Sequence, residues 1–536
     1  MRILLAASEV APFAKTGGLA DVAGALPKAL AKLGHDVRVV LPRYRMVDAA
    51  KHRLRPMLDS LPVPVAGRTE IAALWQGEIG PVPVSFVQHN GYYDREALYQ
   101  TKDGDYPDNA ERFAFFSRAV LELSRALEWI PDVYHCNDWQ TGLIPTYLRT
   151  TLQGAREFQA AGVLFTVHNL GYQGLFGPEA LAAANLGNEL FNPFGIEFYG
   201  KVNLLKAGMV FADLINTVSR KYSQEIQTEE FGHGLEGVLR ARAKDLHGIL
   251  NGIDYDEWHP GRDSFIAARF SQDDLAGKAT CKADLQRAFG LPERADVPLL
   301  AVISRLASQK GMDLVAEALD AMLDLDTQFV LLGTGDVALH QAFETATARH
   351  GSRIGLKLGF DVGLSHKIEA GADMFLMPSR YEPCGLNQMY SLAYGTVPIV
   401  RATGGLDDTI QPFDPATGEG NGFKFSGTTA EALLDTLRAA VALYHRPEEW
   451  RRLMRNGMAC DFSWDRSARE YEADALESPE QRSMVRGTHA TAVGLHRGAV
   501  GPGGSVVRGS SELPNARTLL GGCGKTPYCP GCSKRS

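Results

Sequence analysis

The sequence has no long hydrophobic run and few cysteines. No stretch approaches the roughly 20 consecutive apolar residues of a membrane-spanning helix, so we expect no membrane partner. Among the seven cysteines of this 536-residue chain, Cys136, Cys281, Cys384 and Cys460 stand singly, which excludes a disulfide framework. The opening "MRILLAASEV" lacks the small-residue cleavage site of a secretory signal. We therefore expect a cytoplasmic protein.

Positive charge is scarce outside the end of the chain. The net charge is −8, yet residues 481–536 hold eight lysines and arginines and one acidic residue, so the rest of the chain is strongly acidic. An acidic body argues against nucleic acid as the main partner. The apolar fraction of 45% is ordinary for a globular protein, and 536 residues exceed what one hydrophobic core usually serves. We expect two large domains and a tail.

Two signatures of cofactor or metal chemistry are also absent. The dinucleotide fingerprint GxGxxG is missing from the first turn between a strand and a helix, which counts against a nicotinamide-dependent oxidoreductase. In the tail, "CGKTPYCPGC" brings Cys523, Cys529 and Cys532 close together, but no histidine or fourth cysteine is near enough to complete a structural zinc site. We favour an extension without a metal.

Strand and helix patterns alternate from the first residue. "MRILLAA" and "HDVRVVLP" are typical of buried strands, and residues 17–34 between them have the apolar spacing of a helix. The second half repeats the alternation with "PLLAVIS", "QFVLLG", "RIGLKLG", "DMFLMP" and "TVPIVR". This pattern predicts an α/β fold of parallel sheets with helices on both faces. Turn-rich residues 250–263 separate the predicted domains, which comprise residues 1–249 and 250–478, and residues 479–536 are predicted to be disordered.

Two predicted turns from strand to helix carry cations beside flexible backbone. "KTGGLADV", residues 15–22, places Lys15 next to two glycines where the N–H groups of a helix favour an anion. "SRLASQKG", residues 304–311, places Arg305 and Lys310 at a similar turn of the second half. A plain tight turn and surface salt bridges are the alternatives. Because the turns come from different halves, we interpret them as two sides of one diphosphate site.

A third turn, "SRYEPCGLNQ" at residues 379–388, combines an acid with backbone donors. It follows "DMFLMP" and precedes the helix-like "QMYSLAYG", so it lies at the carboxyl end of a strand. Ligands of parallel α/β sheets bind at that edge, and the N–H groups of the next helix point toward them. The turn therefore suits a ligand that needs both a fixed carboxylate and free backbone donors.

Seven segments, in order across roughly residues 1–470, resemble those of the bacterial glycogen synthases and related starch synthases. They are "KTGGLADVAGALPKAL", "HCNDWQTGLIP", "FTVHNLGYQG", "LNGID", "SRLASQKG", "PSRYEPCGL" and "RATGGLDDT". The resemblance implies a GT-B fold, in which two Rossmann-like domains face a deep cleft. It also implies retaining transfer of glucose from a nucleoside diphosphate glucose to the non-reducing 4-hydroxyl end of an α-1,4-glucan such as glycogen, without a cofactor. The last helix, at about residues 460–478, would cross back to the first domain.

The resemblance also implies roles for single residues. Residues on the donor side would hold the diphosphate (Lys15, Arg305, Lys310 and, by close backbone approach, Gly18) and the glucose (His168, Asn251, Glu382 and the N–H groups of Cys384, Gly385 and Leu386). Asp21 and Asp138 would lie nearer the acceptor. Of these, His168, Glu382, Arg305 and Lys310 are the catalytic candidates. Without the resemblance we would interpret His168 as a structural histidine.

The expected chemistry needs neither a protein nucleophile nor a metal. Electrostatic stabilisation of the departing diphosphate supports an oxocarbenium-like transition state, with front-face attack by the acceptor. A hydrolase with paired catalytic carboxylates would not require a site that binds a diphosphate. "DGD" at Asp103–Asp105 looks like the metal-binding triplet of another glycosyltransferase fold, but it lies in a polar turn where such residues are common.

Several alternatives stay open. A non-catalytic glucan-binding protein would have lost Lys15, Arg305, Lys310 or Glu382, and all four are present. A transferase for another nucleotide sugar is conceivable, because ADP-glucose rather than UDP-glucose rests on the bacterial resemblance. A glucan phosphorylase would need a lysine-bound pyridoxal cofactor. The sequence does not indicate the oligomeric state. It departs from the family's usual residues at Asn137, Gly171 and Asn387, where histidine, alanine and threonine are common.

Overall fold

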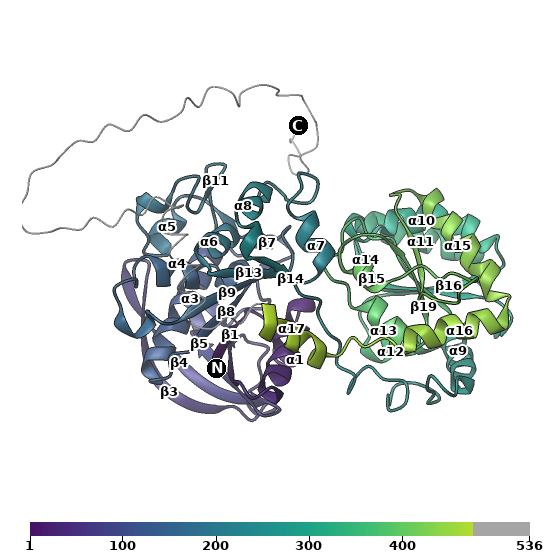
Figure 1. Cartoon of the computed structure of the whole chain (residues 1–536), viewed down its shortest axis with the longest axis horizontal. Coiled ribbons are helices and arrows are strands. Elements are labelled where there is room, and N and C mark those ends of the chain that lie inside the picture. The colour runs from purple at the N-terminus through teal and green to yellow at the C-terminus, as the bar shows by residue number, and fades with distance from the viewer. Residues whose placement is uncertain (475–536) are drawn as a thin grey trace, which may run out of the picture. The chain divides into compact units, whose positions relative to one another are not determined.

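Buried strands of the first half form one nine-stranded sheet (Figure 1). The computed structural model describes residues 1–474. In β1 every residue after the first is buried, and its neighbours β2 and β8 pair with it in parallel. In sheet order the strands are β14 (Leu246–Gly248), β13 (Leu214–Thr217), β9 (Gly162–Val167), β8 (Val133–Asn137), β1 (Arg2–Ala6), β2 (Asp36–Pro42), β5 (Val82–Gln88), β4 (Arg68–Ile79) and β3 (Arg55–Val65).

Helices lie on both faces of this sheet, as expected for parallel strands. The predicted first helix is confirmed as α1, most of which is buried. The helices are α1 (Gly18–Lys32), α2 (Asn90–Tyr93), α3 (Asn109–Ala126), α4 (Leu143–Arg149), α5 (Ala180–Ala183), α6 (Leu204–Phe211), α7 (Arg220–Glu225) and α8 (Glu236–Ala241). Two small sheets accompany them: β10 (Leu175–Phe176), β12 (Lys201–Asn203) and β11 (Glu197–Phe198) form one, and the hairpin β6 (Gln100–Thr101) and β7 (Gly104–Asp105) forms the other.

The outer edge of the first sheet is antiparallel, which the sequence pattern did not predict. β3 pairs with β4 and β4 with β5 in antiparallel register, whereas β5 pairs with β2 in parallel. Toward its end the long strand β3 alternates buried and exposed residues, as expected for a strand with one solvent-exposed face. Two prolines, Pro62 and Pro64, interrupt that alternating stretch, so its strand signal is weak in the sequence.

The second half forms a six-stranded sheet that is parallel throughout. The five strands predicted there are confirmed, and a sixth, β20, joins them. The sheet order is β17 (Ile354–Leu358), β16 (Gln328–Gly335), β15 (Leu299–Leu306), β18 (Met374–Met377), β19 (Val397–Arg401) and β20 (Phe423–Phe425). Successive residues of β15 enter different clusters, since Leu300 and Val302 belong to one and Leu299 and Ala301 to another. Both faces of the sheet are therefore buried. The helices are α9 (Ala276–Ala288), α10 (Met312–Leu323), α11 (Val337–His350), α12 (Val362–Gly371), α13 (Asn387–Ala393), α14 (Gly404–Thr409), α15 (Ala430–Tyr444) and α16 (Pro447–Met458).

The last described helix, α17 (Trp464–Asp474), contacts the first half of the chain. Asn216 Nδ2 donates to the hydroxyl of Tyr471 at 3.0 Å, and Ser467 Oγ donates to Leu250 O at 2.7 Å. Tyr471 is fully buried. The division into domains at residue 250 stays a prediction. Residues 479–536, with Cys523, Cys529 and Cys532, lie outside the described residues.

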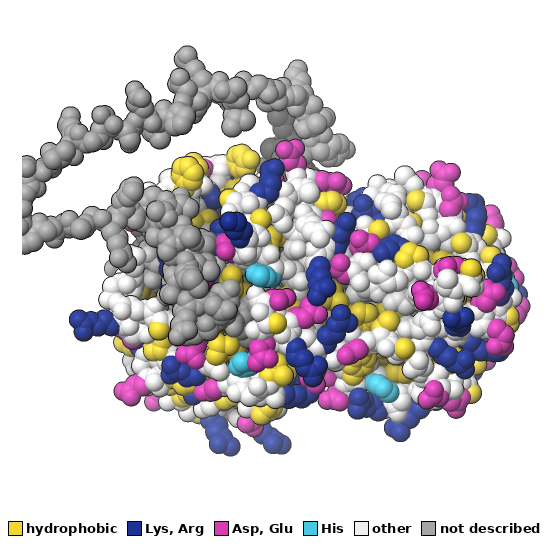
Figure 2. Space-filling view, viewed as in Figure 1, with side chains coloured by type: hydrophobic (Ala, Val, Ile, Leu, Met, Phe, Trp, Pro, Cys, Tyr) yellow, Lys and Arg dark blue, Asp and Glu magenta, His cyan; other side chains and the backbone are white. Residues whose placement is uncertain are grey.

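The surface mixes both signs of charge. Figure 2 shows lysine and arginine side chains interspersed with aspartate and glutamate on the face it draws. That face has no broad area of positive charge. Within residues 1–474 we find no helix that is both long and apolar enough to cross a membrane.

Candidate active site

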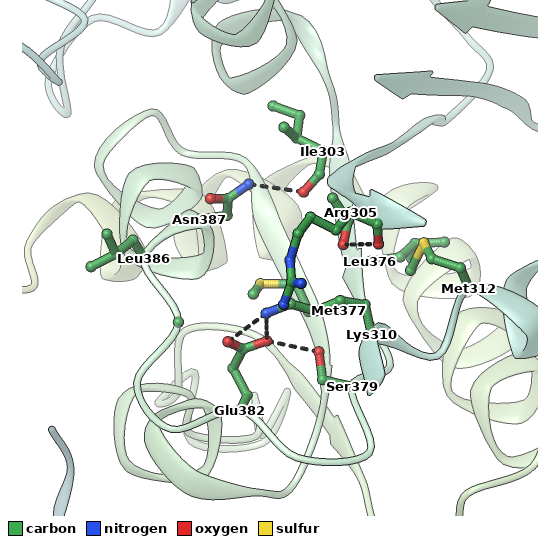
Figure 3. Close-up of a pocket in the computed structure, with 12 residues that line it drawn as sticks. Ile303, Arg305, Lys310, Met312, Leu376, Met377, Ser379, Glu382, Leu386 and Asn387 are labelled. Carbon is green, nitrogen blue, oxygen red and sulfur yellow. Dashed lines mark hydrogen bonds and ion pairs between the residues drawn. The ribbon is translucent and has the colours of Figure 1, made fainter. Parts of the chain in front are cut away.

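A pocket of about 190 Å³ opens at the carboxyl ends of β15 and β18 (Figure 3). Parallel strands end at one edge of their sheet, so turns that are far apart in the sequence meet there. Five residues predicted for the site lie in its wall, namely Arg305, Lys310, Glu382, Gly385 and Leu386. Ser379 and Asn387 line it as well. The pocket thus combines cations, one carboxylate and a helix start.

Glu382 and Lys310 form an ion pair inside this pocket. Lys310 lies in the short helix η5 (Ser308–Lys310), and its Nζ donates to both carboxylate oxygens of Glu382, at 2.7 and 2.6 Å. Ser379 Oγ donates to Glu382 Oε2 at 2.9 Å. Glu382 is 5% exposed. Its carboxylate is therefore held in one orientation by two side chains.

Arg305 lies at the end of β15 and contacts the first half of the chain. Its Nη1 donates to the hydroxyl of Tyr172 at 3.3 Å, and its Nη2 donates to Gln309 Oε1 at 3.1 Å. Both partners are neutral, so these bonds leave the positive charge of Arg305 uncompensated. A guanidinium in this state suits an anionic ligand.

The turn at Lys15 is held by an acid that we did not predict. Thr16 N donates to Glu9 Oε2, Gly17 N donates to the same oxygen at 3.2 Å, and Thr16 Oγ1 donates to Glu9 Oε1 at 2.6 Å. Tyr99 also donates its hydroxyl to Glu9 Oε1 at 2.7 Å. Two of the expected anion-binding N–H groups are thus used within the protein. Glu9 orders the turn, and the start of α1 at Gly18 is left for a ligand.

Gly18 and Lys15 have different surroundings. A Cβ on Gly18 would lie 3.9 Å from Leu386 Cδ1, so Gly18 lies against the turn of residues 379–388. Lys15 Nζ donates to Asp21 Oδ1 at 2.6 Å. Burial raises the pKa of Asp21, and Lys15 opposes that shift. Lys15, which we expected to bind the diphosphate, and Asp21, which we expected on the acceptor side, thus form an ion pair.

His168 is buried and held in one tautomer by Asn137. The amide of Asn137 donates Nδ2 to Ala6 O at 3.1 Å and to His135 O at 3.2 Å, so its oxygen faces His168. His168 Nε2 therefore donates to Asn137 Oδ1, at 2.9 Å. Burial, with a smaller contribution from His135, lowers the pKa of His168 to about 3. The imidazole is neutral at pH 7, and Nδ1 keeps a lone pair for a hydroxyl group.

Asp138 follows β8 in a conformation that is rare for a residue with a side chain. Its φ of +57° lies in the left-handed region, and its Oδ1 accepts the N–H of His168 at 2.8 Å. Burial raises the pKa of Asp138 to about 7, although the N–H groups of His168 and Asn169 lower it. This carboxyl group can therefore gain or lose a proton near neutral pH.

Asn251 and Cys384 are both nearly buried. Asn251 is 5% exposed, and within the described part of the chain its Oδ1 accepts no hydrogen bond. A buried amide oxygen in this state suits a ligand hydroxyl. Burial raises the pKa of the Cys384 thiol to about 12, which excludes a thiolate nucleophile at neutral pH. Cys384 does not line the pocket, whereas the next two residues do.

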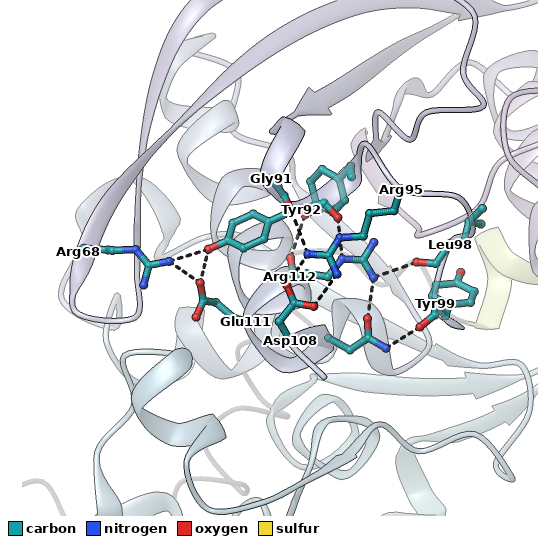
Figure 4. Close-up of polar contacts among 11 residues, drawn as sticks. Arg68, Gly91, Tyr92, Arg95, Leu98, Tyr99, Asp108, Glu111 and Arg112 are labelled. Carbon is teal, nitrogen blue, oxygen red and sulfur yellow. Dashed lines mark hydrogen bonds and ion pairs between the residues drawn. The ribbon is translucent and has the colours of Figure 1, made fainter. Parts of the chain in front are cut away.

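A buried arginine supports the loop that carries Tyr99 (Figure 4). Arg112 is fully buried, and it donates to Tyr92 O at 2.7 Å, to Leu98 O at 3.0 Å and to Asn109 Oδ1 at 2.6 Å. Asn109 in turn donates to Tyr99 O at 2.9 Å. Because Tyr99 contacts Glu9, these bonds connect α3 with the turn at Lys15.

The "DGD" triplet lies away from these contacts, in the hairpin of β6 and β7. Thr101 pairs with Gly104, and Asp103 and Asp105 are exposed. In residues 1–474 no three histidine, cysteine, aspartate or glutamate side chains are grouped closely enough to hold a metal ion. Within the hairpin, Asp103 N donates to Thr101 Oγ1 at 3.2 Å.

Sequence reasoning missed three residues around the site. Glu9 and Tyr172 act through contacts with distant segments, which no local pattern indicates. Phe360 follows β17 at the carboxyl edge of the second sheet and is 80% exposed. Its signal in the sequence was an aromatic residue, in "LGFD", at the end of a predicted strand.

Known proteins share both halves of this architecture. The family model described as starch synthase catalytic domain matches residues 2–241, and the model described as glycosyl transferases group 1 matches residues 286–457. Glycogen synthase from Koribacter versatilis is 52% identical over 472 residues, covering 88% of this chain and 97% of the relative. Glycogen synthase from Anaeromyxobacter sp. is 53% identical over 476 residues, covering 88% of this chain and 98% of the relative.

Solved structures agree with this match. The catalytic domain of starch synthase IV from Arabidopsis thaliana, bound to ADP and acarbose, has a TM-score of 0.82 and 35% identity, covering 90% of this chain and 99% of that one. Sucrose-phosphate synthase from Thermosynechococcus elongatus, with a TM-score of 0.55 and 17% identity, shares the fold. The two Rossmann-like sheets and the matched models define a glycosyltransferase with the GT-B fold.

Within that class, the two glycogen synthases above show the family, because they are 52% and 53% identical to this chain over most of its length. The chain belongs to the glycogen synthase family, which includes the related starch synthases.

Proposed function

We propose that this protein transfers glucose from ADP-glucose to the non-reducing 4-hydroxyl end of an α-1,4-glucan, with retention of configuration. The observation that carries the proposal is the pocket at the carboxyl ends of β15 and β18, where Lys310 and Glu382 pair beside Arg305. A diphosphate leaving group needs cations, and a sugar beside it needs a fixed hydrogen-bond acceptor. In this pocket Arg305 and Lys310 supply the cations, and Glu382 supplies the hydrogen-bond acceptor.

Each side chain has a distinct task in the proposed reaction. Arg305 and Lys310 stabilise the negative charge that develops on the departing diphosphate, and the start of α1 at Gly18 adds N–H groups from the other half. Glu382 accepts hydrogen bonds from donor hydroxyls and shares Lys310 with the phosphate. His168 Nδ1 and Asn251 Oδ1 accept further sugar hydroxyls. The acceptor hydroxyl attacks from the face that the diphosphate leaves.

Adenine is the proposed base of the donor. A relative's catalytic domain was bound to ADP and acarbose, and that chain is 35% identical to this one. Phe360 offers an exposed ring at the same sheet edge as Arg305, since β17 and β15 both flank β16. A purine presents a larger face for stacking than a pyrimidine does. Replacing Phe360 with alanine should therefore raise KM for ADP-glucose.

The remaining partners follow from this activity. Glycogen or another α-1,4-glucan is the proposed acceptor, and neither nucleic acid nor a membrane is a proposed partner. We propose that the protein acts in the cytoplasm, where nucleotide sugars are made. Asp21 and Asp138 are proposed on the acceptor side of the site.

The proposal is tested by glucose transfer to glycogen, with ADP-glucose and UDP-glucose compared on one enzyme preparation. We expect ADP-glucose to be the better donor and the new linkage to be α-1,4. A higher kcat/KM with UDP-glucose would contradict the assignment of the base. No transfer from either donor, by protein that binds glycogen, would instead support a non-catalytic role.

A further inference from the structure

A buried carboxylate of the first half is hydrogen-bonded to the start of a helix in the second half. Glu225 is the last residue of α7 and is 8% exposed. Its two oxygens accept the N–H of Gly404, each at 3.1 Å, and the hydroxyl of Thr403, at 3.2 and 3.3 Å. Thr403 is fully buried, and Gly404 is the first residue of α14. One acid from the first half therefore binds two buried donors at the start of α14.

A second carboxylate makes the reverse contact. Asp408 lies near the end of α14, and its Oδ2 accepts the N–H of Lys221, near the start of α7, at 2.9 Å. The two helices pack against each other (Figure 1). Because each contact joins the start of one helix to the end of the other, α7 and α14 are antiparallel. Each helix thus supplies an acid for the first backbone N–H groups of its neighbour.

The start of α14 lies directly on the turn of residues 379–388. Gly405 N donates to Glu382 O at 3.1 Å and to Pro383 O at 3.2 Å. A Cβ on Gly404 would collide with Glu382 O, and a Cβ on Gly405 would collide with Cys384 O. Only glycine allows the two backbones to approach so closely. A shift of Gly404 would therefore displace the backbone of Glu382.

The two acids differ in what they hold. Glu225 binds Gly404, which abuts Glu382, so its removal would leave buried donors without an acceptor beside that turn. Asp408 binds Lys221, so its removal would free a donor in the first half. Variants of the two acids can therefore separate two effects: holding the halves together and holding the turn of residues 379–388 in place.

We propose that Glu225 is a positioning residue for the donor sugar: it holds the start of α14, and thereby the backbone of Glu382, where the Glu382 carboxylate can receive glucose hydroxyls. This inference rests on the proposed function and adds to it a residue that does not line the pocket. Arg305 and Lys310 belong to the segment at the end of β15, so the proposed diphosphate contacts should persist without Glu225.

The first test compares two ligands that differ by the glucose group. ADP-glucose and ADP are titrated by calorimetry without an acceptor. Glu225→Ala should weaken binding of ADP-glucose about tenfold and leave the affinity for ADP within about twofold. Because a dissociation constant does not depend on how much of the protein is folded, the ratio of the two affinities is unaffected by partial unfolding. Glu225→Gln should restore most of the ratio, since its amide oxygen still accepts the N–H of Gly404.

Asp408→Ala and Glu229→Ala are the matched controls. Asp408→Ala breaks the reverse contact, so it should lower the melting temperature but keep the ratio of the two affinities. Glu229 is exposed in the segment after α7, and Glu229→Ala should change neither quantity. Equal losses of affinity for ADP and ADP-glucose in Glu225→Ala would overturn the inference. The same change of ratio in Asp408→Ala would also overturn it, because Glu225 would then only hold the two halves together.

Hydrogen exchange, followed by mass spectrometry, makes the result independent of the donor. In the ligand-free protein, Glu225→Ala should speed exchange of the amides of residues 382–386 about tenfold, whereas Asp408→Ala should speed exchange at residues 220–222. Unchanged exchange at residues 382–386 in Glu225→Ala would overturn the inference by itself. If exchange there rises as expected but the parent protein transfers no glucose, the proposed function fails while the positioning role of Glu225 stands.

Discussion

Lys310 and Glu382, 72 residues apart in the sequence, share two hydrogen bonds of 2.7 and 2.6 Å at the edge of one sheet. The pair joins the cation proposed for the diphosphate to the acid proposed for the sugar. In the proposed function, donor binding gives Lys310 phosphate oxygens as partners and gives Glu382 sugar hydroxyls. Charge compensation within the pocket thus changes with the ligand.

Replacing Glu382 with glutamine should lower kcat about a hundredfold, which corresponds to roughly 3 kcal/mol at the transition state. Affinity for ADP should stay close to that of the parent protein, because Lys310 remains. Glu431→Gln, at an exposed position of α15, is the control and should leave turnover unchanged. A Glu382→Gln protein with full turnover and a lower melting temperature would show that the acid is merely structural.

Asp138 should make the free energy of unfolding depend on pH. Burial raises its pKa to about 7 from the usual 3.8, so between these values the folded state holds a proton that the unfolded state has lost. This contribution to stability is complete below pH 4 and is lost as pH rises through 7.

Asp138→Asn should therefore be more stable than the parent protein at pH 8, by on the order of 2 kcal/mol, and the gain should shrink toward pH 4. Urea unfolding at pH 5 and pH 8 measures it. A gain that is equal at the two pH values would contradict the assigned pKa.

Arg112→Lys should destabilise the first half of the chain. Lysine cannot reproduce the three contacts of this buried guanidinium, and we expect a loss of about 3 kcal/mol in urea unfolding. Arg68→Lys is the control, since Arg68 is half exposed and the loss of its solvated ion pairs with Glu70 and Glu111 should change stability little. Similar losses in both variants would refute the structural role of Arg112.

Tyr471→Phe should remove the hydrogen bond from Asn216 and leave the buried Nδ2 of that residue without this partner, while Asn216 Oδ1 still accepts from Thr166. The expected cost is about 1–2 kcal/mol. Tyr199→Phe, at an 83% exposed position, should cost nothing measurable. The melting temperatures of the two variants, followed by circular dichroism, measure this loss of stability. A Tyr471→Phe protein as stable as the parent protein would contradict the prediction.

Removal of divalent metal ions should leave glucose transfer intact. In the proposed function, Lys15, Arg305 and Lys310 supply the positive charge that a metal supplies in other transferases. The measurement is transfer to glycogen before and after dialysis against EDTA. Activity that disappears and returns with magnesium or manganese would assign a metal to this reaction.

The sequence predicted the parts of the site that follow strand ends. Arg305 lies at the end of β15, and Lys310 and Glu382 lie in the turns that follow β15 and β18, so their meeting in one pocket follows from parallel topology. The bond between Asn137 and His168 could not be predicted, because it depends on how β8 and β9 are placed side by side. Glu9 was missed for a similar reason: a carboxylate that binds a neighbouring turn looks the same in sequence as an exposed one. The antiparallel edge at β3 and β4 was hidden by prolines.

The contacts of α17 have a consequence for the order in which the polypeptide becomes structured during synthesis. Asn216 lies on β13 of the first sheet, but its partner Tyr471 leaves the ribosome more than 250 residues later. Domains generally fold in order of emergence from the ribosome. Asn216 therefore lacks this hydrogen-bond partner until the last described helix, α17, has been made.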